Sequence, residues 1–413
     1  MGGDEVLHAT NKNSGKEIVP MIFMGPLYQP ELEKELMKEI PEGRLSNAAN
    51  QYQADLLSGL AGAVQNLKII NVLPVGTWPK HYRSPLLRDR QWQFAGEKCF
   101  EVGCINLPVL KQWIRAKRIS SFLKKRCNGE TEVIIYSVYL PFLNAVQELP
   151  ADVKVTLIVT DLPEYYDLGQ TSFVKRILRK VNNHFIYKKL ARVDRYVLLT
   201  EKMKERLPVG DKPYKIVEGI WNQKTCRQAE LKESSERKVV FYAGTLHRQF
   251  GIMTLLEVFK CLEDDAELWI CGAGDCEEEV KAEAEKDGRI RFFGYISSDE
   301  VEKLRSQATV LVNPRPNEGE YTKYSFPSKT MGYMASGKPV VMSKLDGIPD
   351  EYDEFLLYPR DDSIEAWTEV LEKVLSMSVE ERTVIGEKGQ RFVLENKNAV
   401  TQVRKILEMI NNS

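Results

Sequence analysis

The sequence lacks the features that several common classes of protein require. Only four of its 413 residues are His and seven are Cys, no two Cys form a Cys-x-x-Cys pair, and no zinc-binding spacing occurs. No apolar run approaches the roughly 20 residues of a membrane-spanning helix. These absences argue against a zinc domain and a membrane-spanning protein. The odd, scattered set of thiols favours a reducing, cytoplasmic location.

The N-terminus also lacks a targeting signal. Residues 1–17 contain no apolar segment of the kind that a signal peptide carries, and position 6 is not the Ser or Thr of a myristoylation signal. We expect a disordered lead-in there. The remaining chain is long enough for two or three domains, and 43% hydrophobic with 28% charged residues is typical of a soluble globular protein. A net charge of −1 indicates no particular partner.

Short β-branched runs alternate with amphipathic segments in both halves of the chain. This pattern predicts an α/β fold in which parallel sheets are connected by helical crossovers. The expected strands are 17–25, 67–75, 132–138, 154–161, 195–200 and 214–219 in the first half, and 238–244, 267–274, 290–296, 309–315 and 338–343 in the second. The two halves should form two doubly wound, Rossmann-like domains that face each other.

The polar segment 222–237 separates the two halves and is typical of an exposed linker. We therefore expect an N-terminal domain at 18–221, a C-terminal domain at 238–385, and a C-terminal helix at 386–413 that packs back toward the N-terminal domain. Ligands of such domains bind beyond the carboxyl ends of the strands. The functional loops should follow Gly25, Asp161, Gly244, Gly274, Gly294 and Arg315.

Glycine-containing loops follow two of these strands in the second half. Gly244 stands between a strand and a helix, where backbone N–H groups can receive an anion, although a tight turn without a ligand explains it equally well. Arg248 in the same loop could pair with a phosphate or be solvated. Gly272 and Gly274 resemble the start of a dinucleotide fingerprint, but the third Gly is absent. A nicotinamide oxidoreductase is therefore nearly excluded.

The loop 313–330 is the most informative segment. It is long and of mixed charge, and loops of this length in compact domains usually have a function. At its end a hydroxyl, an ammonium and backbone N–H groups meet at the start of a predicted helix, which suits a diphosphate. These residues are Ser325, Phe326, Pro327, Ser328 and Lys329. A solvated Lys329 is the alternative. Strand 292–296, around Tyr295, either reads a base edge with its backbone or is plain core.

The order of these motifs resembles the glycosyltransferase family 4 group of GT-B-fold retaining sugar transferases, and most closely its bacterial exopolysaccharide and capsule enzymes. The similarity rests on YAG–GI, ICGAG, FFGYI, NPR and YSFPSKTM-x-YMASGKPVV in the second half. In the first half, 48–57, 73–82, 102–112, 136–143, 160–166 and 198–203 resemble the acceptor-domain signatures of that subgroup. The resemblance covers the whole chain.

The resemblance implies a donor site for a UDP- or GDP-sugar in the C-terminal domain and a glycan or polyprenyl-diphosphate-linked acceptor in the N-terminal domain. It implies no metal and no cofactor, because the nucleotide sugar is a substrate; the chain contains no Asp-x-Asp pair. The catalytic candidates are Asp161, Arg248 and Lys329, although Asp161 is equally well explained as a helix cap. The donor-binding candidates are Gly244, Thr245, Gly272, Gly274, Tyr295, Arg315, Tyr324, Ser325, Phe326, Pro327, Ser328, Lys329 and Thr330.

Two departures from the family pattern concern the donor site. The family has a Glu, seven further residues and a second Glu, and these positions are Tyr324 and Gly332 here. The resemblance implies that the second Glu holds the donor ribose, and Gly332 offers no such acceptor. In the glycine-rich loop the family often has Arg and Lys, where this chain has Thr245 and Phe250. The alternative function is therefore a catalytically weak GT-B protein that acts as a glycan- or membrane-binding scaffold.

Two segments of the first half are strongly basic. Residues 111–126 and 174–192 each carry seven Lys or Arg and no acidic residue, with apolar residues at helical spacing. Basic amphipathic helices are typical of proteins that bind anionic membrane surfaces. The alternatives are a solvated helix face and a nucleic-acid site, but no nucleic-acid-binding module is visible. We favour a cytoplasmic protein in peripheral contact with the inner face of the membrane.

Overall fold

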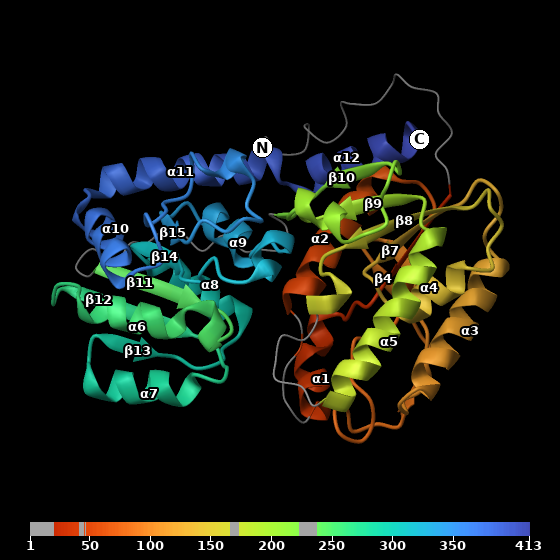
Figure 1. Cartoon of the computed structure of the whole chain (residues 1–413), viewed down its shortest axis with the longest axis horizontal. Helices are drawn as coiled ribbons and strands as arrows, with labels where there is room; N and C mark the ends of the chain where they lie inside the picture. The colour runs from red at the N-terminus through yellow and green to blue at the C-terminus, as the bar shows by residue number, and fades with distance from the viewer. Residues whose placement is uncertain (1–19, 41–44, 46, 166–172, 223–237) are drawn as a thin grey trace, which may run out of the picture.

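The structure of the chain, a computed structural model, describes residues 20–40, 45, 47–165, 173–222 and 238–413. The expected lead-in and nearly all of the expected linker lie outside these residues. Two α/β domains lie side by side, with the C-terminal domain on the left of Figure 1 and the N-terminal domain on the right. This is the doubly wound architecture that the alternating pattern predicts.

The described N-terminal sheet has eight strands in the order β10-β9-β8-β7-β1-β2-β5-β4. Every neighbouring pair is parallel except β4 and β5. The strands are β1 (Met21–Gly25), β2 (Leu67–Asn71), β4 (Arg90–Phe94), β5 (Glu97–Glu101), β7 (Glu132–Tyr136), β8 (Lys154–Val159), β9 (Arg195–Leu198) and β10 (Tyr214–Ile216). Alternate residues of β1 enter two separate hydrophobic clusters, so the sheet is buried on both faces.

The described C-terminal sheet has five parallel strands in the order β13-β12-β11-β14-β15. They are β11 (Lys238–Ala243), β12 (Ala266–Cys271), β13 (Ile290–Phe292), β14 (Val310–Asn313) and β15 (Val340–Met342). The strand order reverses between β11 and β14, and ligands of doubly wound folds bind at such a switch point. All expected strands are present, though most are shorter than their apolar runs.

Helices cover both sheets. Those of the N-terminal domain are α1 (Glu33–Glu39), α2 (Asn47–Ala63), α3 (Leu110–Lys124), α4 (Leu140–Val146) and α5 (Phe173–Lys189). The others are α6 (Ile252–Lys260), α7 (Glu277–Lys286), α8 (Ser298–Gln307), α9 (Lys329–Ala335), α10 (Ile364–Ser376), α11 (Val379–Asn396) and α12 (Ala399–Asn411). Among these helices, none combines the length and the apolar character that a membrane crossing requires.

The antiparallel hairpin β4–β5 was not among the expected strands. Its two-residue turn is Ala95-Gly96, with φ angles of 49° and 86°. Such a turn needs positive φ at both positions, and Asn-Gly or Asp-Gly is its usual sequence. The small two-stranded sheet of β3 (Leu86–Leu87) and β6 (Cys104–Ile105) was also not expected. Strands of two residues are too short to show the alternation of apolar and polar residues from which a strand is predicted.

The chain passes between the domains at two places that lie side by side. The backbone N–H of Trp221 donates to the carbonyl of Lys397 at 2.8 Å, and Trp221 pairs with Asn398 in a parallel bridge. At this second crossing α11, which packs on α9, gives way to α12, which packs on α2. The final helical segment is thus two helices.

A buried ion cluster lies at this junction. The side chain of Lys397 is 1% exposed and pairs with Glu218, whose side chain is 2% exposed, and with Glu351 at 2.6 Å. The Tyr352 hydroxyl donates to the Glu218 carboxylate at 2.6 Å. A buried ammonium requires such carboxylates, because desolvation of an unpaired charge costs several kcal/mol. The cluster thus links Glu218, which lies just before the first crossing at Trp221, to Lys397, which lies at the second crossing.

Candidate functional site

A cavity of about 940 Å³ lies between the two domains. It opens at the carboxyl ends of both sheets, and its volume is within the range of ligand-binding clefts. The wall from the first half includes Asn47, Tyr52, Tyr136, Asp161, Tyr165, Glu218 and Trp221. The wall from the second half includes Thr245, Phe250, Glu302, Arg305, Arg315, Tyr324, Ser325, Phe326, Pro327, Ser328, Lys329 and Gly332.

Lys329, the first residue of α9, reaches across the end of β11. Its Nζ lies 4.0 Å from the centroid of the Tyr242 ring. A Cβ atom placed on Gly244 would come within 2.5 Å of the same Nζ. Gly244 therefore leaves the space in which the Lys329 ammonium lies. This is a physical reason for glycine directly after the strand.

The protein around Lys329 favours its neutral form. The cavity leaves part of the side chain accessible, but burial, and to a smaller extent the nearby charge of Arg315, together lower the pKa of the ammonium to about 7. No carboxylate pairs with Lys329 among the residues that the structure describes. An anion that entered the cavity would supply the missing partner and stabilise the protonated form.

Arg315 provides a second cation in the same part of the cavity. Its Nη2 donates to Ser325 Oγ at 3.0 Å, and its guanidinium faces the rings of Tyr321 and Phe250, at 4.8 Å and 5.5 Å from their centroids. Its Nε is buried and has no hydrogen-bond partner in the described structure. Arginine and lysine together at one end of a partly desolvated cavity suit a phosphate-type anion.

Asp161 lies on the opposite, N-terminal wall. Its side chain is accessible to solvent in the cavity, but the surrounding walls raise the pKa of its carboxyl by desolvation. A hydrogen bond from Thr160 and the positive charge of Arg315 oppose this rise. Asp161 therefore lies within electrostatic reach of the Arg315 guanidinium on the opposite wall.

Aromatic contacts hold the two walls together at the rim. The ring of Tyr324 stacks on Tyr165, with centroids 5.7 Å apart, and its hydroxyl accepts from Arg206 Nε at 3.2 Å. At another point of the rim, Asn47 Nδ2 donates to the Tyr295 hydroxyl at 3.3 Å. Tyr324 and Tyr295 thus take part in contacts between the domains.

The structure brings most, but not all, of the predicted residues together. Asp161, Thr245, Arg315, Lys329, Gly332 and the run Tyr324, Ser325, Phe326, Pro327 and Ser328 line the cavity. Gly272 and Gly274 pack behind the Gly244 loop, where Cβ atoms would lie 1.8 Å from Gly244 O and 2.1 Å from Leu246 O. Thr330 is buried in the core, 3.8 Å from the sulfur of Met342.

Arg248 is not brought to the cavity. Its Nη2 pairs with Glu279 on α7 at 2.9 Å, and its side chain is 65% exposed. The second cation of the site is instead Arg315, which follows β14. Arg248 is therefore left out of the site that we propose below.

Three further residues of the cavity wall were not among the candidates. Arg305 and Glu302, both on α8, form an ion pair, and Trp221 stands at the first crossing between the domains. All three line the cavity around Gly332. A Cβ on Gly332 would lie 3.1 Å from Arg305 Nη1 and 3.5 Å from the Trp221 ring. The sequence pattern of a helix such as α8 does not show that its buried Arg305 lines a cavity.

One part of the sequence matches a known family. The sequence model of a family described as "Glycosyl transferases group 1" matches residues 237–377, which comprise most of the C-terminal domain. A search of curated proteins finds no match to this chain. The matched segment contains Gly244, Arg315 and Lys329.

Solved structures resemble the whole chain. The apo form of the lipopolysaccharide outer core galactosyltransferase WaaB is 14% identical, with a TM-score of 0.62 over 95% of this chain and 99% of that chain. Sucrose-phosphate synthase from Thermosynechococcus elongatus is 14% identical, with a TM-score of 0.67 over 95% and 98%. HepE from Anabaena, solved with UDP and glucose, is 12% identical, with a TM-score of 0.62 over 96% and 100%. At these identities the likeness shows the fold, which is GT-B.

Proposed function

We propose that this protein is a retaining, metal-independent hexosyltransferase, which moves a sugar from a UDP- or GDP-sugar onto a glycan or lipid-linked acceptor. One observation carries the proposal: Lys329 and Arg315 place two cations in the interdomain cavity, within the segment that matches the glycosyltransferase family. The family match and the GT-B fold support nucleotide-sugar chemistry, and HepE, of the same fold, was solved with UDP and glucose.

In the proposed reaction the diphosphate lies against Lys329 and Arg315. As the bond between the sugar and the diphosphate breaks, negative charge develops on the leaving phosphate, and the two cations stabilise it. The acceptor hydroxyl approaches from the N-terminal wall, where Asp161 orients it or the transferred sugar. The leaving phosphate itself takes up the proton of that hydroxyl. The nucleotide sugar is the substrate, and no further cofactor takes part.

The proposed biological role is cell-surface polysaccharide synthesis in the cytoplasm, and the assignment to family 4 belongs to the same proposal. Both the role and the family assignment are supported by the order of motifs across the chain and by the fold that this chain shares with WaaB. The alternative is a catalytically weak protein that binds a glycan or a membrane as a scaffold. Gly332 favours this alternative, because it leaves the cavity wall without a carboxylate at that position.

Calorimetry with UDP, GDP, ADP and dTDP separates the two functions. We expect binding of UDP or GDP, followed by turnover of a matching nucleotide sugar in a screen read by mass spectrometry. Binding of none of the four nucleotides would overturn the transferase proposal. Nucleotide binding without turnover of any donor in the screen would favour the alternative, a catalytically weak scaffold protein.

Nucleotide binding should take up protons above neutral pH. The free Lys329 has a lowered pKa of about 7, so at pH 8 it is mostly neutral, and a bound diphosphate restores its charge. We expect uptake of nearly one proton at pH 8 and an affinity that falls up to about tenfold per pH unit above 7. Titrations in two buffers with different ionisation enthalpies measure the uptake, and zero uptake at pH 8 would contradict this assignment.

The proposal includes peripheral contact with an anionic membrane. The described part of α5 turns apolar side chains outward: Ile177, Leu178, Val181 and Phe185 are 46%, 63%, 50% and 50% exposed. At 100° per residue these four occupy one stripe of the helix. The face that packs on the protein includes Ile186, which is buried. A helix with an ordinary solvated face would instead turn its polar side chains outward and its apolar ones toward the protein.

Basic side chains lie around this apolar stripe. The exposed Lys180 and the half-buried Lys189 lie on either side of it, and the exposed Lys188 lies in line with it at the C-terminal end of the helix. An apolar stripe with lysines at its edges is typical of helices that lie in the interface of an anionic membrane. A second exposed apolar group stands near the start of α3, where Val109 and Trp113 are 81% and 55% exposed. Both helices pack against α4 and belong to the proposed acceptor domain.

Replacing Leu178 and Phe185 with glutamate should abolish binding to anionic vesicles. The double variant removes two apolar anchors and adds two charges that anionic lipid repels, so we expect at least about a tenfold loss. Co-sedimentation with vesicles of phosphatidylglycerol and phosphatidylcholine measures it. Val384→Glu, at another exposed apolar residue, on α11 of the C-terminal domain, is the control for adding a glutamate to the surface. Equal binding of the double variant and the control would contradict the membrane assignment.

A further inference from the structure

A second cavity, of about 300 Å³, lies in the N-terminal domain beneath the loop between β2 and β3, which contains Tyr82. Its floor is α1, and its walls come from that loop and from β4. The lining residues are Leu32, Glu35, Leu36, Lys38, Glu39, Tyr82 and Arg90. None of them lines the interdomain cavity. This second cavity is hereafter the α1 pocket.

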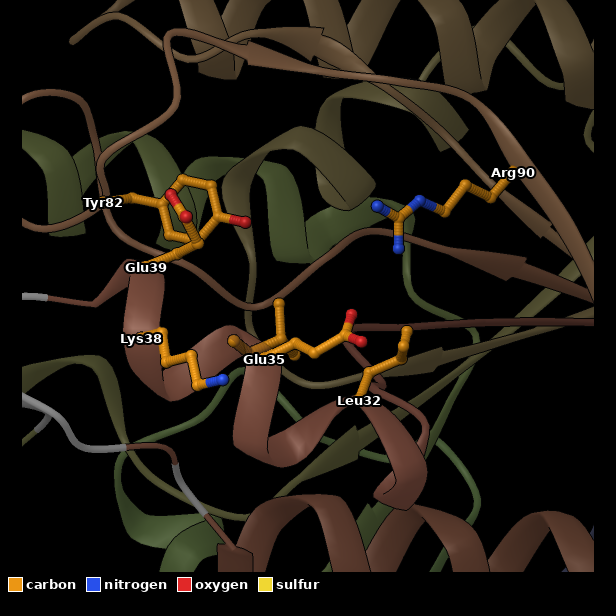
Figure 2. A pocket seen from close by; sticks show the side chains of 7 residues that line it. Leu32, Glu35, Lys38, Glu39, Tyr82 and Arg90 are labelled. Carbon is orange, nitrogen blue, oxygen red and sulfur yellow. The ribbon is translucent and has the colours of Figure 1, made fainter.

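Polar groups converge in the α1 pocket. Figure 2 shows the Arg90 guanidinium and the Tyr82 hydroxyl pointing toward one another across the space above α1, with the Glu35 carboxylate below them. The side chain of Arg90 is 54% exposed, and its Nε lies 4.0 Å from the buried Glu101 carboxylate. Within the described residues, the carboxylates of Glu35 and Glu39 have no side-chain partner. The pocket thus offers free acceptors opposite donors.

The charges of the α1 pocket balance. The lining contains two carboxylates, Glu35 and Glu39, and two cations, Lys38 and Arg90, and Glu101 near Arg90 offsets part of the guanidinium charge. A phosphate would gain from the two cations but lose to the two carboxylates, and for an amine the reverse holds, so the lining favours neither an anion nor a cation over a neutral ligand. Hydroxyl groups both donate and accept, and they can satisfy carboxylates and a guanidinium at once. The balance therefore favours a neutral polyhydroxylated ligand.

Apolar side chains complete the site. Leu36 is buried and Leu32 is half-buried in the same wall, and the Tyr82 ring is 7% exposed. Neutral sugars present C–H groups on one side and hydroxyls at the edge, and they match a wall of this kind. A volume of about 300 Å³ is at the small end of known ligand pockets. It suits a single sugar residue rather than a nucleotide sugar.

The α1 pocket lies next to the interdomain cavity. Glu33, the first residue of α1, accepts from Asn47 Nδ2 at 3.2 Å, and Asn47 lines that cavity. The seven residues of α1 span about 10 Å. A glycan that leaves the cavity past the first turn of α1 would reach the pocket within that length.

We propose that the α1 pocket binds a neutral sugar residue of the acceptor, at a distance from the residue that receives the transferred sugar. The pocket would hold the acceptor chain in place while its reacting end lies in the interdomain cavity. The assignment of the ligand to the acceptor rests on the proposed function, whereas the binding of a neutral sugar does not.

Titration of the full chain with neutral methyl glycosides tests the inference. The probes are the methyl α-glycosides of glucose, galactose and mannose, with glucuronate, glucosamine and inorganic phosphate for comparison, each titrated both without nucleotide and in the presence of excess UDP or GDP. We expect at least one neutral glycoside to bind, and Glu35→Gln/Glu39→Gln to weaken it at least about tenfold. Glu31→Gln, at an exposed carboxylate that lines neither cavity, should leave it unchanged.

The outcomes are distinguishable. The inference is overturned if no neutral glycoside binds, if the double variant binds it like the wild-type chain, or if a charged probe binds more tightly than every neutral one. Nucleotide binding, measured on the same variants, should change less than about twofold. If the wild-type chain binds no nucleotide, the proposed function is overturned, but binding of a neutral glycoside would still show that the α1 pocket is a sugar site. Arg90→Gln provides a second variant on the opposite wall.

Discussion

Replacing Lys329 with alanine is expected to lower kcat/KM for the nucleotide sugar by about 10²–10³-fold. The Lys329 ammonium lies over Gly244, at the end of the strand that starts the matched family segment, and no carboxylate in the described structure competes for it. Charge on the leaving phosphate would lose one of its two cations. Single-turnover kinetics with the donor identified in the screen measure the loss.

The same substitution should leave stability unchanged or slightly raised. Burial makes the charged form of Lys329 unfavourable, as its lowered pKa shows, so the side chain contributes little to folding. Lys373→Ala, at an exposed lysine of α10, serves as the control for surface charge. Wild-type kcat/KM in Lys329→Ala would remove Lys329 from the reaction. A large loss of stability would instead make Lys329 a structural residue.

Replacing Lys397 with methionine should destabilise the folded chain by about 3–5 kcal/mol. Methionine keeps the length of the side chain but leaves the Glu218 carboxylate buried without its cation. The remaining partner of that carboxylate would be the Tyr352 hydroxyl, which donates at 2.6 Å. A lower midpoint of urea unfolding, followed by tryptophan fluorescence, measures the effect.

A double variant identifies the cause of this loss. Lys397→Met/Glu218→Gln removes the stranded charge while the Tyr352 hydrogen bond can persist, so it should recover at least about 1 kcal/mol. Lys388→Met, at an exposed lysine of α11, is the control for lysine removal. If both Lys397 variants are equally unstable, the loss comes from packing at the junction and not from the unpaired carboxylate.

The strands of both sheets could be predicted because their signal is local. β1 and β11 are runs of apolar residues buried on both faces, and such runs are visible in the sequence. The hairpin β4–β5 could not be predicted in the same way. Its strands alternate with exposed polar residues, and its Ala95-Gly96 turn is not one of the usual sequences for positive φ.

The residues of the candidate site also divide into those that the local sequence predicts and those that depend on long-range packing. The loop 313–330 could be predicted, since its length and composition set it apart, and Arg315 and Lys329 both line the cavity. Arg248 also stands in a loop after a strand, but the direction of its side chain depends on Glu279, which lies on a different helix. Trp221 and Arg305 reach the cavity only because the domains face each other. Long-range packing of this kind leaves no mark on the local sequence.

Gly332 illustrates the limit in a single residue. From sequence alone it is a costly glycine within a short helix. In the structure its missing side chain leaves open the space beside Arg305 Nη1 and the Trp221 ring, both of which line the cavity. The helix itself, α9, has only seven residues.

Because α12 packs on α2 of the N-terminal domain, the two domains cannot be exchanged through a single junction between them. A chimera that takes its donor half from another protein would carry a foreign α12 if it were joined only between the domains. That helix would have to fit against Gly59 of α2, where a Cβ would lie 2.7 Å from the carbonyl oxygen of Ala399. Grafting therefore needs a second junction, at Lys397 and Asn398, so that α12 stays with the acceptor half on which it packs. A related protein that exchanged its donor domain by recombination would likewise have to keep an α12 that fits against α2.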